Sequence, residues 1–477
     1  MKIYGTTIYI GNFTIDTKYG LFNVYSYQDL IHKGYIIAFS YGNINDKDIL
    51  YTRIHSSCVT SETLRSMDCD CVQQLYGAFK TVSEQGYGII FYLIQEGRGC
   101  GYVGKSMACM RVQYNDEKIT TFDAYEMLGM KKDYRNYSNI YDICKMLNII
   151  DKEYILLTNN PDKINGLRDI GIKIHDVQSI EFLPNPFNQS YLISKEKTGH
   201  QLYYAKKKIQ KYSLKIPKCE PFEPYHLKNC MRFVHVSTYY LPIKPVDYNI
   251  ILNIQKLRLL EKEINRKLCY IKITNEKLYV QTSELLVNKY PNILCKPHWF
   301  KAHVYYDIIT HQDLIVLQYG NIDKNNSPIV RIQSESILDR FPLKVKINKT
   351  KYKKAIDLII KNDCGIIVLF YHDGKGSGYG RLVLNKIAKN IKNIGMNTDV
   401  RDYYAAAQLV KHHINNKKIT ILYSQKQSKD LLQNGLNQSD VNIYKWIYIG
   451  NGEKTKGTDI ICQRIHECYS KYLTFDE

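Results

Sequence analysis

The sequence predicts an α/β fold, with mixed α+β sheets and flanking helices, and two copies of that fold in tandem. Short apolar runs that suit buried strands alternate with amphipathic segments that suit helices. The clearest examples are a helix over Val72–Glu84 before a strand over Gly88–Ile94, and a helix over Asn139–Leu147 before a strand over Tyr154–Leu157. The chain of 477 residues has room for about two to four domains.

An internal repeat indicates the two copies. Tyr41–Ile44 and Tyr319–Ile322 share one sequence, and the apolar run that starts at Gly88 has a counterpart at Gly365. Further pairs follow in the same order: Arg53 with Arg331, Ser56 with Ser334, Ser57 with Glu335, Glu96–Gly101 with Asp373–Gly378, Asp133 with Asp399, Arg135 with Arg401, and Lys163 with Lys429.

We predict four segments from these features: a first copy over 1–216, a connector over 217–295, a second copy over 296–451 and a tail over 452–477. Pro217, Pro221 and Pro224 follow a lysine-rich stretch and mark the first boundary. In the connector we expect a helix around Asn249–Lys267 and find no chemical motif.

Three cysteines close together form the strongest candidate metal site. Ten residues separate Cys58 from Cys69, and Cys71 follows after one more. Thiolates are soft ligands that select zinc over magnesium or calcium. A structural zinc takes four protein ligands, whereas three leave a position for water or substrate, as in catalytic sites. The alternative is that these are buried thiols that pack as small apolar side chains.

A glycine-rich turn follows the apolar strand that starts at Gly88. In this turn, Gln95–Gly101, three glycines surround Arg98. Glycines let backbone amides approach an anion, and a guanidinium offers a planar fork of donors, so the stretch suits a phosphate-binding loop. Taken alone, such a stretch is more often a plain turn than a phosphate site.

These motifs together resemble GTP cyclohydrolase II, over most of residues 40–205 and in the order of that family. The matching pieces are Arg53–Cys58, Cys69–Cys71, Gln95–Gly99, Asp133–Arg135, Leu157–Pro161 with Lys163, and Thr198–His200. The resemblance implies hydrolytic opening of the imidazole ring of GTP, with release of formate and pyrophosphate, as the first step of riboflavin biosynthesis.

The resemblance also assigns roles to residues. Cys58, Cys69 and Cys71 match the zinc ligands, Arg135 matches the residue proposed to attack the α-phosphorus, and Asp133 matches its proton acceptor. Magnesium is expected on the triphosphate. The positions that match GTP contacts are Arg53, Ile54, His55, Ser56, Ser57, Gln74, Glu96, Gly97, Arg98, Thr121, Thr158 and Lys163.

Each of these residues also has a structural interpretation. Asp133 and Arg135 could form a surface ion pair of little energetic value, and a permanently charged Arg135 could clamp phosphate. Thr158 could end a strand before a helix that starts at Pro161. His55 could be a core histidine whose hydrogen bonds are satisfied.

Two positions depart from the family pattern. Ser57 stands where the family usually has glutamate before the first cysteine, and Cys109 stands where it has a tyrosine used in the hydrolytic steps. A thiol does not reproduce the reach or hydrogen bond of a phenol. The alternative function is therefore an enzyme that opens GTP but stops at the formylated pyrimidine, or that serves another pathway.

The second copy lacks the candidate zinc ligands. Ser336 replaces Cys58, and Lys344–Lys349 replaces the turn with Cys69 and Cys71. Candidate phosphate-binding residues remain at Lys375, Asp399, Arg401 and Lys429. We predict a non-catalytic copy that packs against the first as a pseudo-dimer. A regulatory nucleotide pocket is the alternative, and further homo-oligomers stay open.

Composition and charge limit the classes of partner that we expect for this protein. The net charge is +20, but the basic residues are scattered and form no recognised nucleic-acid module, so GTP is the expected partner and nucleic acid is not. No apolar run approaches the roughly 20 residues of a membrane span. Thiols with a metal motif favour the reducing cytoplasm. A different class also stays open: a non-catalytic nucleotide-binding protein with a structural zinc.

Overall fold

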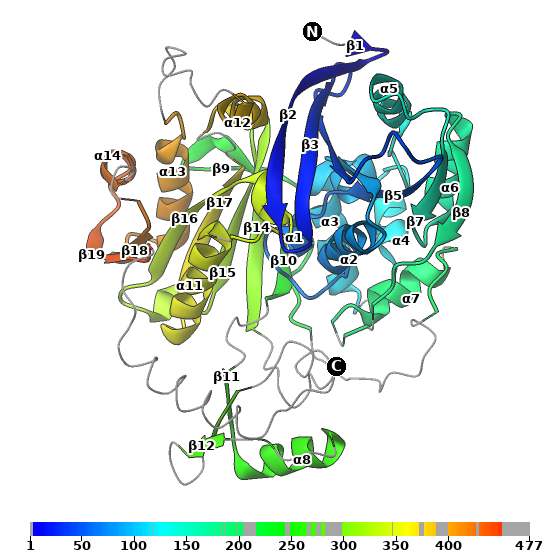
Figure 1. The fold of residues 1–477 in the computed structure, drawn as a ribbon. Coiled ribbons are helices and arrows are strands. Elements are labelled where there is room, and N and C mark those ends of the chain that lie inside the picture. Colours follow the sequence, from blue (N-terminus) through cyan, green and yellow to red (C-terminus); the bar gives the residue numbers. More distant parts are fainter. Residues whose placement is uncertain are drawn as a thin grey trace.

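The computed structural model contains two similar α/β units and a smaller three-stranded element (Figure 1). It describes residues 3–116, 118–182, 184–185, 187–197, 199–203, 216–243, 249–264, 268, 270–272, 278–281, 298–345, 347–371, 376–387, 399–425 and 429–450. The predicted tail over 452–477 and Lys375 lie outside these residues.

The first unit is built on an eight-stranded mixed sheet. Its order is β1 (Ile3–Tyr4), β2 (Thr7–Thr17), β3 (Gly20–Asp29), β4 (Tyr35–Tyr41), β6 (Gly88–Leu93), β5 (Ile49–Ser56), β7 (Glu153–Leu157) and β8 (Lys173–Gln178). Pairing is antiparallel from β1 to β6 and parallel from β6 to β8. Every residue of β6 is buried, as expected of a strand covered on both faces.

The helices of the first unit confirm the predicted alternation. They are α1 (Val59–Glu62), α2 (Cys71–Glu84), the 3-10 turn η1 (Glu96–Gly99), α3 (Gly101–Tyr114), α4 (Thr121–Met127), α5 (Ser138–Met146), α6 (Pro161–Asp169) and α7 (Gln189–Lys197). Helix α2 buries Leu75, Ala78, Phe79 and Val82, whose spacing forms one helical face. Helix α6 starts where Asn160 accepts a hydrogen bond from the Asp162 amide.

The second unit repeats this topology strand for strand. Its order is β9 (Tyr225–Leu227), β10 (Cys230–Ile243), β14 (His298–Asp307), β15 (Gln312–Tyr319), β17 (Gly365–Tyr371), β16 (Ile329–Glu335), β18 (Ile419–Tyr423) and β19 (Ile443–Tyr448). Its helices are η3 (Ile322–Lys324), η4 (Ile337–Arg340), α11 (Ile347–Lys361), α12 (Gly378–Ile387), α13 (Tyr403–Ile414) and α14 (Lys429–Gln438). The tandem fold predicted from the repeat is therefore confirmed.

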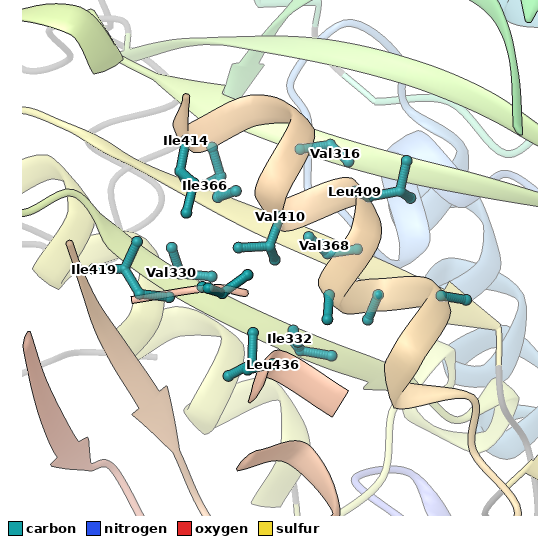
Figure 2. Close-up of a cluster of buried hydrophobic side chains, with 14 of the residues drawn as sticks. Val316, Val330, Ile332, Ile366, Val368, Leu409, Val410, Ile414, Ile419 and Leu436 are labelled. Carbon is teal, nitrogen blue, oxygen red and sulfur yellow. The ribbon is translucent and has the colours of Figure 1, made fainter. Parts of the chain in front are cut away.

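The core of the second unit lies between its sheet and helix α13. Leu409, Val410 and Ile414 project from α13 towards the strands that carry Val330 and Val368 (Figure 2). All five side chains are buried, so this unit keeps a well-packed core although it has lost the thiol motif.

The second unit starts earlier in the chain than the predicted boundary at residue 296. Strands β9 and β10 fall within the predicted connector, but they pair with β14 in the second sheet. Residues 244–297 therefore interrupt the unit between its second and third strands, where the first unit has only the short turn between Thr17 and Gly20. Sequence comparison of the two halves missed β9 and β10 because this long interruption separates them from every repeated motif.

The described part of the interruption is a small sheet with one helix. It contains β11 (Asn249–Leu252), α8 (Ile254–Ile264), β12 (Tyr270–Lys272) and β13 (Leu278–Gln281), in the strand order β11-β13-β12. The helix predicted around Asn249–Lys267 thus begins with a strand instead. Figure 1 shows β11, β12 and α8 below the two large sheets.

The two units pack as a pseudo-dimer in which each lends a helix to the other. Helix α3 of the first unit packs on β10 of the second, and α12 of the second packs on β2 of the first. Two isolated β-bridges have the same reciprocity, since Thr17 pairs with Leu343 and Ser66 pairs with Ile243. Such exchanged contacts are typical of the isologous interface of a two-fold dimer.

The interface is part of the hydrophobic core. One cluster joins Tyr102 of α3 to Tyr239 and Phe300 of the second sheet. Another joins Phe79 of α2 to Phe341 of the second unit. In the described part of the chain, no helix is both long enough and apolar enough to cross a membrane.

Candidate functional site

The largest cluster of predicted site residues surrounds a cavity of about 240 Å³ in the first unit. It opens where the parallel strands β5, β6 and β7 end. Ser57 and Thr158 follow β5 and β7 directly, Gln95 is the second residue after β6, and all three line the cavity. Ligands of open α/β sheets bind at the carboxyl ends of strands. The segments that the sequence motifs occupy therefore converge on one place.

The three predicted zinc ligands meet at this cavity. Cys58 follows β5, and Cys69 and Cys71 lie at the start of α2. The Sγ atoms of Cys58 and Cys69 are 3.7 Å apart, and all three sulfur atoms lie within 4.8 Å of one another. Hydrogen bonds from Cys69 and Cys71 hold the pKa of the Cys58 thiol well below its usual value. Three clustered sulfur donors fit zinc and leave its fourth position to another ligand.

Lys105 of α3 connects the thiol cluster to the glycine-rich turn. Its Nζ donates to Glu96 Oε1 at 2.7 Å, to Thr60 Oγ1 at 3.1 Å and to Cys58 Sγ at 3.3 Å. Glu96 Oε2 in turn accepts from the Val59 amide at 2.6 Å. Burial raises the pKa of Glu96 to about 7, against the opposing charge of Lys105. These contacts fix the turn against the segment that carries Cys58.

The glycine-rich turn takes a left-handed backbone. Gly97 and Arg98 have φ of 58° and 57°, and Gly99 has φ of 86°. A Cβ on Gly99 would lie 2.9 Å from the Tyr134 carbonyl carbon, so glycine is required where the two loops touch.

Arg98 projects from this turn onto α4. Its guanidinium lies 3.4 Å from the Phe122 ring centroid, and Nη2 donates to Thr121 Oγ1 at 3.2 Å. Nη1 is buried without a hydrogen-bond partner among the described residues. A buried donor that lines a cavity without an acceptor favours an anionic ligand.

Asp133 and Arg135 form an ion pair at the cavity wall. Arg135 Nε donates to both carboxylate oxygens of Asp133, at 3.0 and 2.9 Å. Burial disfavours the charged guanidinium, but the hydrogen bond to Asp133 raises the pKa of Arg135 above its ordinary value. Both residues line the cavity, and Arg135 keeps its positive charge there.

Two further cations lie near Arg135. Arg53 donates to the Leu157 carbonyl at 2.6 Å and to Gln74 Oε1 at 2.7 Å, and Lys163 donates to the Ile54 carbonyl at 2.8 Å. Burial, followed by the charges of Arg53 and Arg135, lowers the pKa of Lys163 well below its ordinary value. Arg135 has Asp133 as its partner, whereas Arg53 and Lys163 donate to uncharged groups. Such a group of buried cations favours a polyanionic ligand.

The remaining predicted contacts differ in where they point. Ser56 and Ser57 line the cavity, and both hydroxyl groups are buried without a partner among the described residues. His55 lines it as well, although its Nε2 is bonded to Glu62 Oε1 at 2.8 Å. Ile54 does not line it, because its side chain packs in the core and only its carbonyl oxygen faces Lys163.

Several lining residues were missed by the sequence analysis. Lys105, Phe122, Tyr191, Lys195 and His200 line the cavity. The first four lie on α3, α4 and α7 at positions that carry no motif, whereas His200 follows α7 and belonged to a matched segment.

The second unit also reaches this cavity, through Tyr239 of β10. Its hydroxyl lies 2.6 Å from that of Tyr102. One hydroxyl donates to the other, so one phenolic proton of the pair has no acceptor among the described residues. Cys109 lines the same cavity, and burial raises the pKa of its thiol to about 12.

Comparisons with known proteins match both halves of the chain to one family. Residues 9–179 and 293–444 match the family model described as GTP cyclohydrolase II. The chain is 34% identical over 208 residues to a GTP cyclohydrolase-2 of Actinobacillus succinogenes, covering 43% of this chain and 92% of the relative. It is 36% identical over 197 residues to a GTP cyclohydrolase-2 of Hahella chejuensis, covering 41% and 92%.

A second kind of relative is longer. The chain is 39% identical over 194 residues to a riboflavin biosynthesis protein RibBA of Endomicrobium trichonymphae, covering 40% of this chain and 47% of the relative. The chain therefore spans about half the length of the RibBA relatives that it matches.

Proposed function

Because this chain belongs to the GTP cyclohydrolase II family, we propose that its first unit hydrolyses GTP, opening the imidazole ring and releasing formate and pyrophosphate. The product would be the ribosylamino-pyrimidinone phosphate that begins riboflavin biosynthesis. One observation carries the proposal: a trio of thiols and a group of buried cations line one cavity. The thiols suit a metal near the base, and the cations suit the phosphates.

Zinc is the metal that best fits Cys58, Cys69 and Cys71. Zinc lowers the pKa of a bound water towards neutrality. Lys105 would hold the Cys58 sulfur in place and keep Glu96 at the same wall. The thiols also suit the reducing cytoplasm, which we propose as the compartment.

The cationic part of the cavity would bind the triphosphate and its magnesium ion. Arg53, Arg98 and Lys163 line the cavity and would donate to phosphate oxygens, and Asp133 would orient Arg135. Asp133 and Arg135 are our candidate catalytic pair at the α-phosphorus. The raised pKa of Arg135 supports a role in clamping phosphate more directly than one as nucleophile.

The test is product analysis. The protein, loaded with zinc and incubated with GTP and magnesium, should release formate and pyrophosphate in equal amounts, together with the deformylated pyrimidine, as measured by mass spectrometry. Binding of GTP without turnover by zinc-loaded protein would instead support the non-catalytic alternative.

We predict that GTP binding is accompanied by uptake of a proton at Lys163. Its pKa is low in the free protein, and the triphosphate should raise it, since an adjacent anion favours the charged amine. GTP affinity should be highest below the Lys163 pKa of the free protein, fall as the pH rises through it, and level off above the pKa of the complex.

Calorimetry in two buffers with different ionisation enthalpies measures this uptake, up to about one proton per GTP. The Cys58→Ser variant prevents consumption of the ligand during the titration. Adding Lys163→Met should remove the buffer dependence, and an unchanged uptake in that variant would assign it to another group.

Cys109 favours the alternative product, because a neutral thiol stands at the position of the family tyrosine. Tyr239 offers a phenol to the same cavity from the second unit. We therefore propose that deformylation in this chain depends on Tyr239 rather than on a residue of α3.

Tyr239→Phe should uncouple the release of formate from the release of pyrophosphate. We expect pyrophosphate release to stay within about tenfold of the original rate, whereas formate per pyrophosphate falls, because one hydrogen bond to the reacting groups is lost. Tyr240→Phe is the matched control, since Tyr240 is the next residue in the chain and its phenol does not line the cavity. Equal formate and pyrophosphate from both variants would exclude this role for Tyr239.

A further inference from the structure

A second, smaller cavity lies in the unit that lacks the thiols. It measures about 70 Å³ and opens at the carboxyl ends of β16 and β18. Three cationic side chains line it: Arg331, Lys351 and Arg401. A cavity needs about 10–15 Å³ to hold one water, so this space has room for about five to seven waters or a small anion.

Arg331 is the central feature of this cavity. Only 7% of its surface is exposed. Its guanidinium donates to the Leu422 carbonyl at 3.0 Å, to Ser424 Oγ at 3.1 Å and to Gln333 Oε1 at 3.2 Å. All three acceptors are uncharged, and a buried charge that meets no opposite charge is costly.

The other two cations increase this positive charge. Arg401 donates to Asp399 Oδ1 at 2.8 Å and to Ser334 Oγ at 3.1 Å, which holds its guanidinium at the cavity wall. Lys351 is 8% exposed, and burial, followed by the charge of Arg331, lowers its pKa. Asp399 pairs with Arg401 and the charge of Asp339 acts on Lys351, so Arg331 is the cation that still lacks an anion among the described residues.

The first unit shows why this is a site rather than a packing defect. Arg53 donates to the Leu157 carbonyl as Arg331 donates to the Leu422 carbonyl, from the equivalent strand of each sheet. The second unit has no thiol trio among its described residues, and its cavity is smaller than that of the first unit. Arg331 nevertheless still lines the space that remains.

We propose that the second unit binds a single phosphate group between Arg331, Lys351 and Arg401. Phosphate has five heavy atoms and accepts the paired hydrogen bonds of a guanidinium fork. The ligand we propose is free phosphate or the phosphate of a small monoester, because the three cations converge on one small space. This site does not depend on the activity proposed for the first unit.

The experiment measures phosphate binding to the full chain, by calorimetry and by the rise in melting temperature. Arg53→Met first weakens phosphate binding at the other cavity. In that background we expect one remaining site for inorganic phosphate, and Arg331→Met should weaken it at least tenfold. Lys418→Met is the control, because it removes an exposed positive charge from the same unit.

The outcomes are distinct. Equal phosphate affinity with and without Arg331 would overturn the proposal, and Lys351→Met gives the same test if Arg331→Met does not fold. Glycerol phosphate separates the two sources: competition with inorganic phosphate indicates a monoester site, and lack of competition indicates a site for the free ion. Since no turnover is measured, failure here leaves the proposed hydrolysis of GTP unaffected.

Discussion

Cys58→Ser should remove the proposed zinc and lower GTP turnover by about a thousandfold or more, because that zinc would supply the activated water. Cys58 is the buried member of the trio and contacts both Cys69 and Lys105. A serine hydroxyl stays protonated at neutral pH, so it does not replace a thiolate ligand. Elemental analysis should show about one zinc per chain in the original protein and much less in the variant.

Cys219→Ser is the matched control for this prediction. The Cys219 thiol is also partly buried, but it lies outside the described thiol cluster. This variant should keep both its zinc and its turnover. If Cys58→Ser retained both as well, the proposed metal chemistry would be wrong.

Arg340→Met should lower the free energy of unfolding by about 3–5 kcal/mol, the usual effect of breaking a buried ion pair. Arg340 and Glu335 are 6% and 8% exposed. Arg340 donates to Glu335 at 2.7 and 2.9 Å and, across the pseudo-dimer interface, to the Tyr92 hydroxyl at 3.0 Å. Without Arg340, the Glu335 carboxylate stays buried without its cation.

Urea denaturation measures this loss as a lower midpoint. Combining Arg340→Met with Glu335→Gln should recover much of the stability, since the pair is then replaced rather than broken. A single variant that loses less than about 1 kcal/mol would mean that the pair is solvated.

The same pair connects to the candidate site. Tyr92 donates to Glu62 Oε2 at 2.5 Å, and Glu62 Oε1 holds His55 at 2.8 Å. A residue of the second unit therefore supports a histidine of the first through a chain of hydrogen bonds. We expect Arg340→Met to impair turnover more than its loss of stability alone accounts for.

Local patterns in the sequence were sufficient for much of the fold. The uninterrupted apolar run at Gly88 predicted a strand that is buried throughout. The apolar face of Val72–Glu84 predicted α2 to within one residue. These elements are specified by residues close together in the chain, so periodicity describes them well.

The site was predicted less completely. The thiol trio and the glycine-rich turn lie within short stretches, and their spacing was informative. Lys105 and Tyr239 gave no signal, because their importance arises only from tertiary packing. Lys105 contacts the segment that carries Cys58, and Tyr239 reaches the cavity where β10 packs on α3. Ile54 shows the opposite error: it stands within a matched motif, but strand alternation turns its side chain into the core.

The exchange of helices α3 and α12 between the units has a consequence for assembly. If the halves were separate polypeptides, random pairing would also produce particles with two thiol clusters and particles with none. Covalent linkage removes that mixture, because every molecule then carries one half of each kind. The two halves are thus free to diverge in sequence while their stoichiometry stays fixed.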